Sequence, residues 1–129
     1  MKRHAALLQL SREHHTALKL ARLARFASDS GNADAIAEAA KTISGQFQEE
    51  IDAHFAKEEL ELLPALEALG ETELVRRTLA EHVELRAINQ QLSHPDAEIL
   101  AHFGQLLYDH VRFEERELFE AAQTRLYPV

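Results

Sequence analysis

The chain has 129 residues, of which 46% are hydrophobic and 28% charged, which is typical of one soluble globular domain, expected to span residues 1–129. Its formal net charge of −8 argues against nucleic acid or an anionic membrane as a partner, because both require a basic surface. The sequence contains no cysteine, which excludes disulfides, thiolate metal sites, iron–sulfur ligation and a cysteine nucleophile.

Helix is favoured almost throughout, because Ala, Leu and Glu are abundant and the chain has only four glycines and three prolines. A first helix is expected at about residues 4–28, followed by the polar turn SDSGNAD at residues 28–34. Asn32 in this turn is a good N-cap for the second helix. That helix is expected to end at residues 69–72 (LGET), with Gly70 as a C-terminal cap, and Pro64 is expected to end or kink it.

The third helix ends in the turn LSHPDAE at residues 92–98, and Pro95 is expected in the first turn of the fourth. No strand-like alternation competes with the helical pattern. Four helices joined by short turns predict an all-α protein, an antiparallel up-down-up-down four-helix bundle. No run in these helices is apolar for long enough to span a membrane, and the start does not read as a secretory signal, so we expect a cytoplasmic protein.

The 3.6-residue period predicts the buried face of each helix, and every buried face contains one histidine. His14 lies on an apolar stripe of the first helix, whereas His15 lies with Arg12, Lys19 and Arg22 and is expected at the rim. The inward residues expected on the four helices are Leu7, Leu10, His14, Ala17 and Ala21; Phe47, Ile51, His54, Glu58, Leu62 and Ala65; Val75, Leu79, His82, Leu85 and Leu92; Phe103, Leu106, Leu107, His110, Glu114 and Ala121.

Two helices repeat one phrase, HFAKEELELL from His54 and HVRFEERELF from His110. Residues four apart share a helix face, so each histidine and the glutamate after it can place a ring nitrogen and a carboxylate in one cavity. Buried without partners, such groups would cost several kcal/mol each, and metal ions would resolve this cost. The candidate metal ligands are His14, His54, Glu58, His82, His110 and Glu114.

The number of ligands points to a dinuclear site. If both glutamates bridge two ions, each ion receives two nitrogens and two oxygens, and an octahedral ion keeps about two positions open. Imidazole-rich sites favour iron, zinc, copper or nickel over Mg²⁺ and Ca²⁺. The flanks EHHTALKL and EHVELRAI, which contain His14 and His82, are also alike, so we expect two related helical hairpins around a pseudo-twofold axis.

This combination of motifs resembles the hemerythrin family, specifically the hemerythrin-like HHE cation-binding domains of the type with four histidines and two glutamates. The motifs are EHH with His14, HFAKEELELLP with His54 and Glu58, EHVEL with His82, and HVRFEERELF with His110 and Glu114. The resemblance spans essentially the whole chain. It implies a four-helix bundle with a non-haem di-iron centre, in which two Fe ions share an oxo or hydroxo bridge and both carboxylates.

One position departs from the oxygen-carrying hemerythrins, which have a fifth histidine one turn before the third-helix ligand. Thr78 stands there in this chain, so reversible oxygen carriage is not expected. The pattern resembles members that include di-iron proteins repairing nitrosatively damaged iron–sulfur clusters, although their cysteine-bearing N-terminal domain has no counterpart in this sequence. We expect a di-iron protein that binds or reacts with O₂, peroxide or nitric oxide, in oxygen or iron handling or in the response to oxidative or nitrosative stress.

Other readings remain open at this point. The chain could be a non-catalytic, iron-dependent sensor or metal-storage module, or a helical interaction protein without metal, and its sequence does not decide whether it is an enzyme. His15 could replace His14 as a ligand, and Thr78 could either pack or hydrogen-bond a small molecule. The residues expected to be solvated, or to support the ligands from outside, are Glu59, Glu61, Glu115 and Glu117.

Overall fold

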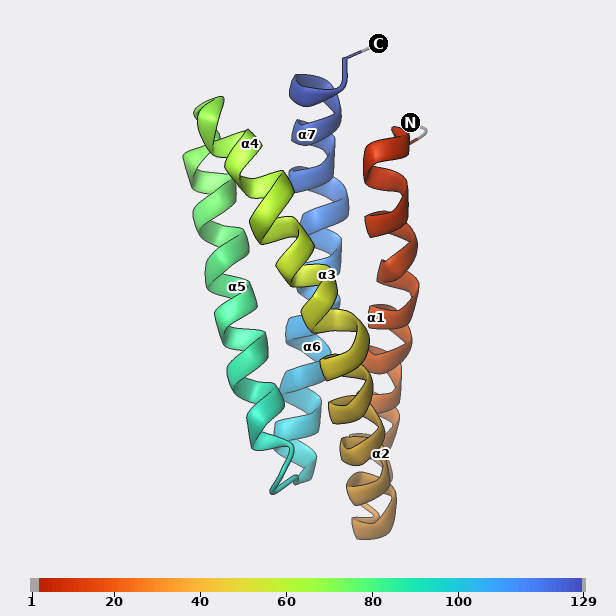
Figure 1. Ribbon diagram of the computed structural model, residues 1–129. Coiled ribbons are helices and arrows are strands. Elements are labelled where there is room, and N and C mark those ends of the chain that lie inside the picture. Colours follow the sequence, from red (N-terminus) through yellow and green to blue (C-terminus); the bar gives the residue numbers. More distant parts are fainter. Residues whose placement is uncertain (1–2, 129) are drawn as a thin grey trace.

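Four long helical rods make up the computed structural model, which describes residues 3–128 (Figure 1). The first rod is α1 (Ala5–Ser30) and the third is α5 (Thr72–Gln91). The second rod consists of α2 (Ala33–Gln46), η1 (Phe47–Ile51), α3 (Asp52–Lys57), η2 (Glu58–Leu62) and α4 (Leu63–Ala68), where η denotes a π-helical turn. The fourth consists of α6 (Ala97–Phe113), η3 (Glu114–Leu118) and α7 (Phe119–Leu126). No strand occurs within these described residues, and the predicted all-α four-helix bundle is confirmed.

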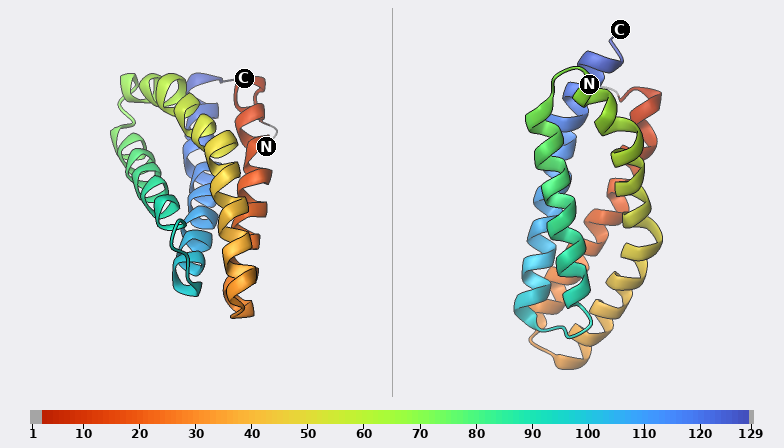
Figure 2. Two further views of the ribbon diagram at one scale, coloured as in Figure 1. Left: turned by 60° about the horizontal axis from the view of Figure 1, so that its bottom comes forward. Right: turned by 60° about the vertical axis from the view of Figure 1, so that its left-hand side comes forward.

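Neighbouring rods run antiparallel, with α1 packed against α2 and α6, and α5 packed against α6. The start of α1, the turn between α4 and α5, and the end of α7 all lie at one end of the bundle (Figure 1). The second rod bows along its length, as the right-hand view of Figure 2 shows. No helix in the described part of the chain is long and apolar enough to cross a membrane.

The helix ends follow local capping chemistry. Asn32 accepts a hydrogen bond from the backbone N–H of Ala35 (2.9 Å), as predicted for the start of the second rod. Gly70 has φ 88°, a left-handed conformation suited to the turn that follows α4. Pro95 does not lie in the first helical turn as expected, because Asp96 after it is the N-cap and accepts from Ile99 N–H (2.8 Å).

Pro64 does not end the second rod. A proline inside an α-helix meets the carbonyl four residues earlier and lacks the N–H that would bond to it. Here the chain passes through the π-helical turn η2 immediately before α4, and Pro64 lies in the first turn of that helix. The same kind of turn recurs at η3, where α7 follows without any proline. Proline alone therefore does not explain the π turns.

The π turns shift the buried stripe by one residue. Beyond η2 the fully buried side chain is Leu66 rather than the predicted Ala65, and beyond η3 it is Ala122 rather than Ala121. A π turn contains about one residue more than an α turn, so a constant 3.6-residue period fails there. On α5 the prediction of Leu79 was also wrong, because Leu79 is 40% exposed and Thr78 is fully buried.

Two apolar clusters fill the interior. One contains Leu10 and Leu66 and lies at the end where α1 begins; the larger contains Ala24, Ile43 and Phe103 and lies at the opposite end. In the first and third rods the predicted ligands His14 and His82 fall in the sequence between the members of the two clusters, and in the second and fourth rods the predicted ligands lie where the two clusters meet. A polar layer therefore crosses the bundle between its two apolar parts.

Candidate metal centre

The structure brings all six predicted ligand residues together in this polar layer. α1 contributes His14, α3 contributes His54, and η2 begins with Glu58. α5 contributes His82, and the fourth rod contributes His110 at the end of α6 and Glu114 at the start of η3. None of these six residues is more than 5% exposed.

The side chains form two groups that share both glutamates. One group consists of His14, His54, Glu58 and Glu114, and the other of Glu58, His82, His110 and Glu114. Within each group one potential ligand atom per residue lies within 4.8 Å of the others. Two adjacent groups, each with two imidazoles and two carboxylates, could therefore each hold a metal ion.

Each carboxylate divides its two oxygens between the two groups. Glu58 Oε2 lies 3.1 Å from His54 Nε2, and its Oε1 lies 3.0 Å from His82 Nε2. Glu114 Oε1 lies 2.8 Å from His14 Nε2, and its Oε2 lies 2.9 Å from His110 Nε2. This is the arrangement expected of carboxylates that bridge two metal ions.

Several of these buried atoms lack a hydrogen-bond partner. They are His54 Nε2, His82 Nε2, His110 Nε2, both carboxylate oxygens of Glu58 and Glu114 Oε2. An unsatisfied buried polar atom costs free energy, and so many at one point would be costly for a small domain. Two cations between the groups would meet all of them, so the residues present fit a dinuclear metal centre.

A family comparison agrees with this geometry. Residues 6–122 match the model of the hemerythrin HHE cation-binding domain.

The chain belongs to the hemerythrin family.

No curated protein and no solved structure matches the chain in the corresponding searches. The family match covers most of the chain and includes all six residues of the centre. Membership supports metal binding by this hemerythrin-like domain. It does not specify which metal is bound or how many ions.

Four further glutamates fix the orientation of the imidazoles in this hemerythrin-like domain. Each accepts a hydrogen bond from the Nδ1 atom of one candidate ligand histidine. The pairs are His14 with Glu115 (2.6 Å), His54 with Glu13 (2.8 Å), His82 with Glu59 (2.7 Å) and His110 with Glu81 (2.7 Å). In every pair the carboxylate comes from a neighbouring rod, so the four bonds form a closed ring around the bundle.

This ring determines which nitrogen faces the centre. An ionised carboxylate only accepts hydrogen bonds, so Nδ1 of each ring carries a proton and Nε2 is the nitrogen that faces the centre. Burial opposes ionisation, yet the pKa values of Glu13, Glu59, Glu81 and Glu115 are lowered, because the bonded histidines and, most strongly for Glu59, Arg86 stabilise the charged form. All four imidazoles are thereby prepared to bind a metal through the same atom.

The ring also shows the pseudo-twofold relation expected from the repeated phrases. His54 with Glu13 corresponds to His110 with Glu81, where the acid precedes the histidine ligand of the adjacent rod. The other two pairs use Glu59 and Glu115, which directly follow the two shared glutamates. The two hairpins thus contribute equivalent contacts.

The pKa values of the inner groups show that the centre attracts positive charge. Burial alone would lower the pKa of His54, but Glu114 and Glu58 outweigh it and raise this pKa to about 11. The same balance raises the pKa of His110 to about 9. The pKa of Glu114 is lowered well below its usual range, because His110 and the other rings outweigh its burial. Burial and the charge of Glu114 raise the pKa of Glu58. Without metal the cavity takes up protons, which metal binding would release.

The remaining residues named from the sequence lie outside the centre. His15 is exposed on α1, so the geometry favours His14. Glu61 and Glu117 are exposed on the π turns, as expected for solvated side chains. Thr78 is buried, and its hydroxyl donates to the carbonyl of Leu74 (2.7 Å), so packing explains it without a bound molecule.

Two of the outer carboxylates, Glu13 and Glu81, had no role assigned from the sequence. The sequence did contain a clue, because a glutamate directly precedes both His14 and His82. The period of one helix places each of these glutamates away from its own buried stripe. Only the packing of neighbouring rods shows that each one reaches the histidine of another helix.

Proposed function

We propose that this hemerythrin-like domain binds two iron ions and uses them to bind or react with O₂, peroxide or nitric oxide. One observation supports the proposal above the others: two four-ligand groups share the two carboxylates of Glu58 and Glu114 in a buried layer. Mixed imidazole and carboxylate ligands suit iron better than Mg²⁺ or Ca²⁺, which prefer all-oxygen sites. The family resemblance favours iron among the transition metals that the ligands would accept.

The expected roles of the ligands follow from the geometry. His14 and His54 would hold one ion, His82 and His110 the other, and Glu58 and Glu114 both. When bound, the ions would supply electron exchange with a small molecule at the coordination positions that the protein leaves open. Four protein ligands leave about two positions of an octahedral ion for such a molecule.

Aromatic side chains limit the access of water to the centre. Phe55 stacks on His82 with ring centroids 3.8 Å apart, and Phe119 stacks on His14 at 5.2 Å. Neither phenylalanine is more than 1% exposed. The apolar rings strengthen the electrostatic contacts inside the layer and restrict the site to small guests.

Reversible oxygen carriage is disfavoured by the residue at position 78. The oxygen-carrying hemerythrins have a fifth histidine there, whereas this chain has Thr78, whose hydroxyl is bonded within its own helix. Fewer protein ligands leave more open positions, which favours reaction with the bound molecule over its simple release. We therefore place the domain in oxygen or iron handling or in the response to oxidative or nitrosative stress.

Anaerobic reconstitution with Fe(II) tests the proposal. We expect two iron ions per chain by metal analysis and a new visible absorption band after exposure to air, hydrogen peroxide or nitric oxide. The zinc-loaded protein serves as the control and should show no such band. Two bound irons without any spectral change would contradict the proposed reactivity, and spectral change without turnover would favour the sensor or storage role.

A further inference from the structure

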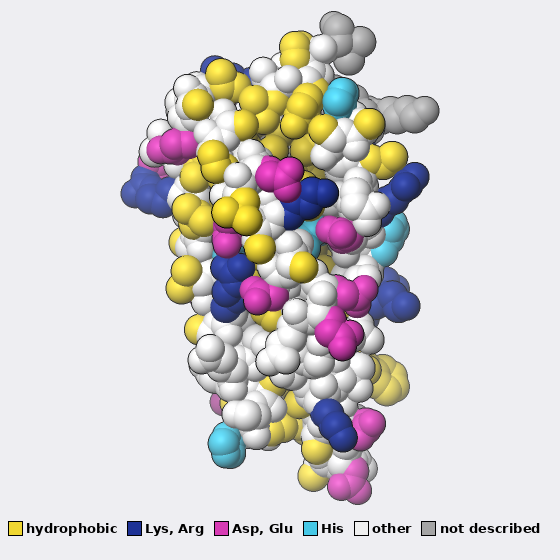
Figure 3. Space-filling model, in the orientation of Figure 1, with side chains coloured by type: hydrophobic (Ala, Val, Ile, Leu, Met, Phe, Trp, Pro, Cys, Tyr) yellow, Lys and Arg dark blue, Asp and Glu magenta, His cyan; other side chains and the backbone are white. Residues whose placement is uncertain are grey.

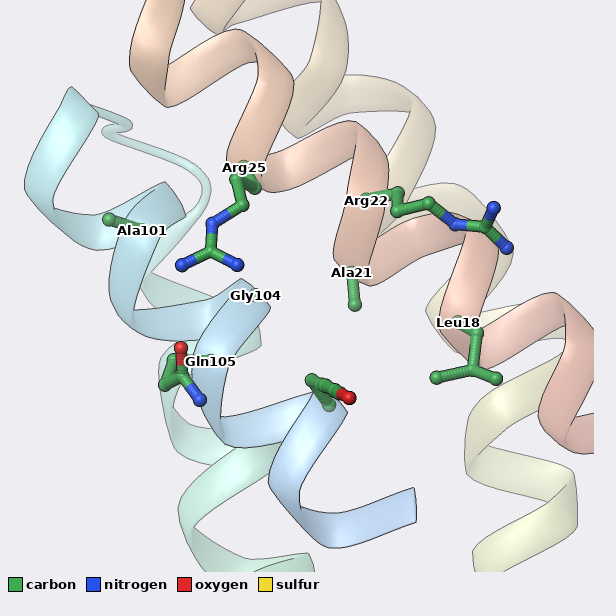
Figure 4. A pocket seen from close by; sticks show the side chains of 8 residues that line it. Leu18, Ala21, Arg22, Arg25, Ala101, Gly104 and Gln105 are labelled. Atoms are coloured by element: carbon green, nitrogen blue, oxygen red, sulfur yellow. The ribbon is translucent and has the colours of Figure 1, made fainter. Parts of the chain in front are cut away.

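A pocket of about 330 Å³ lies on the outer side of the contact between α1 and α6, and none of the six candidate metal ligands lines it. Leu18 and Ala21 from α1, and Ala101 and Tyr108 from α6, form its mainly apolar walls (Figure 4). Its volume lies at the lower end of the roughly 300–1,000 Å³ that is usual for small-molecule sites. The pocket therefore has room for a small ligand with an apolar body.

Close helix packing fixes the floor of this pocket. At Gly104 a Cβ atom would lie 3.0 Å from the carbonyl oxygen of Ala21 and 3.4 Å from the Cβ of Ala24. The two backbones can approach this closely because the contact residues are small. The space beside them is bounded by rigid helix backbone, so no large rearrangement is needed to form it.

One end of the pocket is cationic. The guanidinium group of Arg25 points into the space between the two helices, whereas that of Arg22 points away from it (Figure 4). Neither arginine forms an ion pair with any residue of the described range 3–128. Arg77 and Arg86 behave differently, because each is paired with carboxylates. In the view of Figure 3, several basic side chains on the surface lie beside acidic ones.

Two polar side chains of α6 also line the pocket. The hydroxyl of Tyr108 accepts a hydrogen bond from Arg112 (2.9 Å), which leaves its own proton for a further acceptor. The amide of Gln105 donates to the carboxylate of Asp109 (2.9 Å), which is not itself part of the pocket lining. In a chain with a net charge of −8, an unpaired guanidinium beside an apolar pocket is a specific feature that favours an anion.

We propose that this pocket binds a small organic carboxylate. The carboxylate group would lie at the guanidinium of Arg25, and the apolar body would lie against Leu18, Ala21 and Ala101. The proposal is independent of the metal centre, because it rests on residues of the outer faces of α1 and α6.

Isothermal titration calorimetry of the full chain with hexanoate tests the proposal. Hexan-1-ol, which lacks the carboxylate, and acetate, which lacks the apolar body, serve as control probes. Saturable binding of hexanoate in the millimolar range is expected, and both controls should bind at least about tenfold more weakly. No saturable heat with hexanoate would overturn the proposal. Acetate binding as tightly as hexanoate would also overturn it, because the apolar walls would then contribute nothing.

Two arginine variants provide a matched comparison. Arg25→Gln should weaken hexanoate binding by about tenfold or more, because a charged hydrogen bond is lost, whereas Arg22→Gln should change it by less than about twofold. Ala101→Leu fills the pocket without altering its charge and should weaken binding by at least about fivefold. Equal losses in the two arginine variants would mean unspecific attraction to a basic helix face and would contradict the assigned site.

Discussion

The two halves of the candidate metal centre contain the same kinds of side chain but are supported differently from outside. The first half contains His14 and His54, and the second contains His82 and His110; both share Glu58 and Glu114. In the second half, His82 is fully buried and His110 is 2% exposed, compared with 4% and 5% in the first. The ligand arrangement is thus repeated, whereas its surroundings are not.

The outer carboxylates also differ in their partners. In the second half Arg86 donates to Glu59 (2.7 Å) and Arg77 donates to Glu81 (2.8 Å). In the first half Arg3 pairs with Glu115 (3.0 Å). Glu13 has the neutral amide of Gln9 (3.2 Å) as its second hydrogen-bond partner within residues 3–128, and it forms no ion pair with an arginine there. A carboxylate bonded to a guanidinium is held more firmly than one bonded to an amide. The repeated phrase therefore specifies the ligands, and unrepeated residues specify how rigidly each ligand is held.

Removing a shared glutamate should have the largest effect on iron content, because it takes a ligand from both halves at once. Glu114→Ala removes the oxygens that lie 2.8 and 2.9 Å from His14 and His110. We expect iron content after reconstitution and desalting to fall from two ions per chain to below about one, measured by elemental analysis. Glu117→Ala, an exposed residue of the same π turn, is the control and should retain both ions.

Removing the metal should destabilise both halves at once. Exhaustive chelation leaves the buried ring nitrogens and carboxylate oxygens without partners. We expect the melting temperature to fall by about 10 °C or more, measured by scanning calorimetry, because metal binding is coupled to folding. The melting temperature of the Glu114→Ala variant should respond less to the chelator, because this variant holds less metal. An unchanged transition in the native chain would contradict a structural contribution of the metal.

Single histidine variants should separate the two halves. His54→Ala removes a ligand from the first half and His110→Ala the equivalent ligand from the second. Each variant is expected to keep one tightly bound ion, and the ion left in His110→Ala should bind about tenfold more weakly, because its site has the less rigid support. Titration with Fe(II) against a competing chelator measures both affinities. The opposite order would show that the arginine contacts do not strengthen the second half.

Outer residues should have smaller effects within the second half. Glu81→Gln replaces the charged acceptor of His110 Nδ1 and should weaken iron binding by about tenfold. Arg77→Gln leaves this acceptor in place but removes its support, so a loss of about threefold is expected. Arg76→Gln is the matched control, because Arg76 pairs with Glu73 on the exposed side of the same helix. Competition titration should show no effect of this control.

The smallest effect is expected next to the first half, at His15. His15→Ala should change iron content and affinity by less than about twofold, because this ring is exposed and has no contact with the centre. His14→Ala should remove one ion in the same assay. If the two variants had exchanged effects, His15 rather than His14 would be the ligand from α1.

Much of the fold and the inner ligand set could be predicted from the chain, because both depend on features within a single helix. The spacing of His54 and Glu58, repeated at His110 and Glu114, places each pair on one face whatever the packing. The breakers also marked the turns at Asn32 and Gly70. The use of these residues as metal ligands remains a prediction that the proposed metal analyses test.

Features that depend on two helices could not be predicted in the same way. The contact of Glu13 with His54 requires the relative register of two rods, which the pattern of one helix does not contain. The buried positions Leu66 and Ala122 were missed because a constant period was assumed across the π turns. The same period assigned Leu79 to the core, whereas in the structure Leu79 is 40% exposed and the smaller Thr78 is the buried residue of this turn.

The π turns η2 and η3 each begin at a shared glutamate, Glu58 or Glu114, and add one residue before the chain continues as α-helix. Deleting Leu60, which is 77% exposed, would remove the extra residue of η2 and restore the ordinary α-helical period. Leu66 would then follow Glu58 by two ordinary helical turns and would stay on the buried face, but Pro64 would meet an ordinary helical carbonyl. The extra residue thus lets the second rod continue through its proline while its apolar end still faces inward.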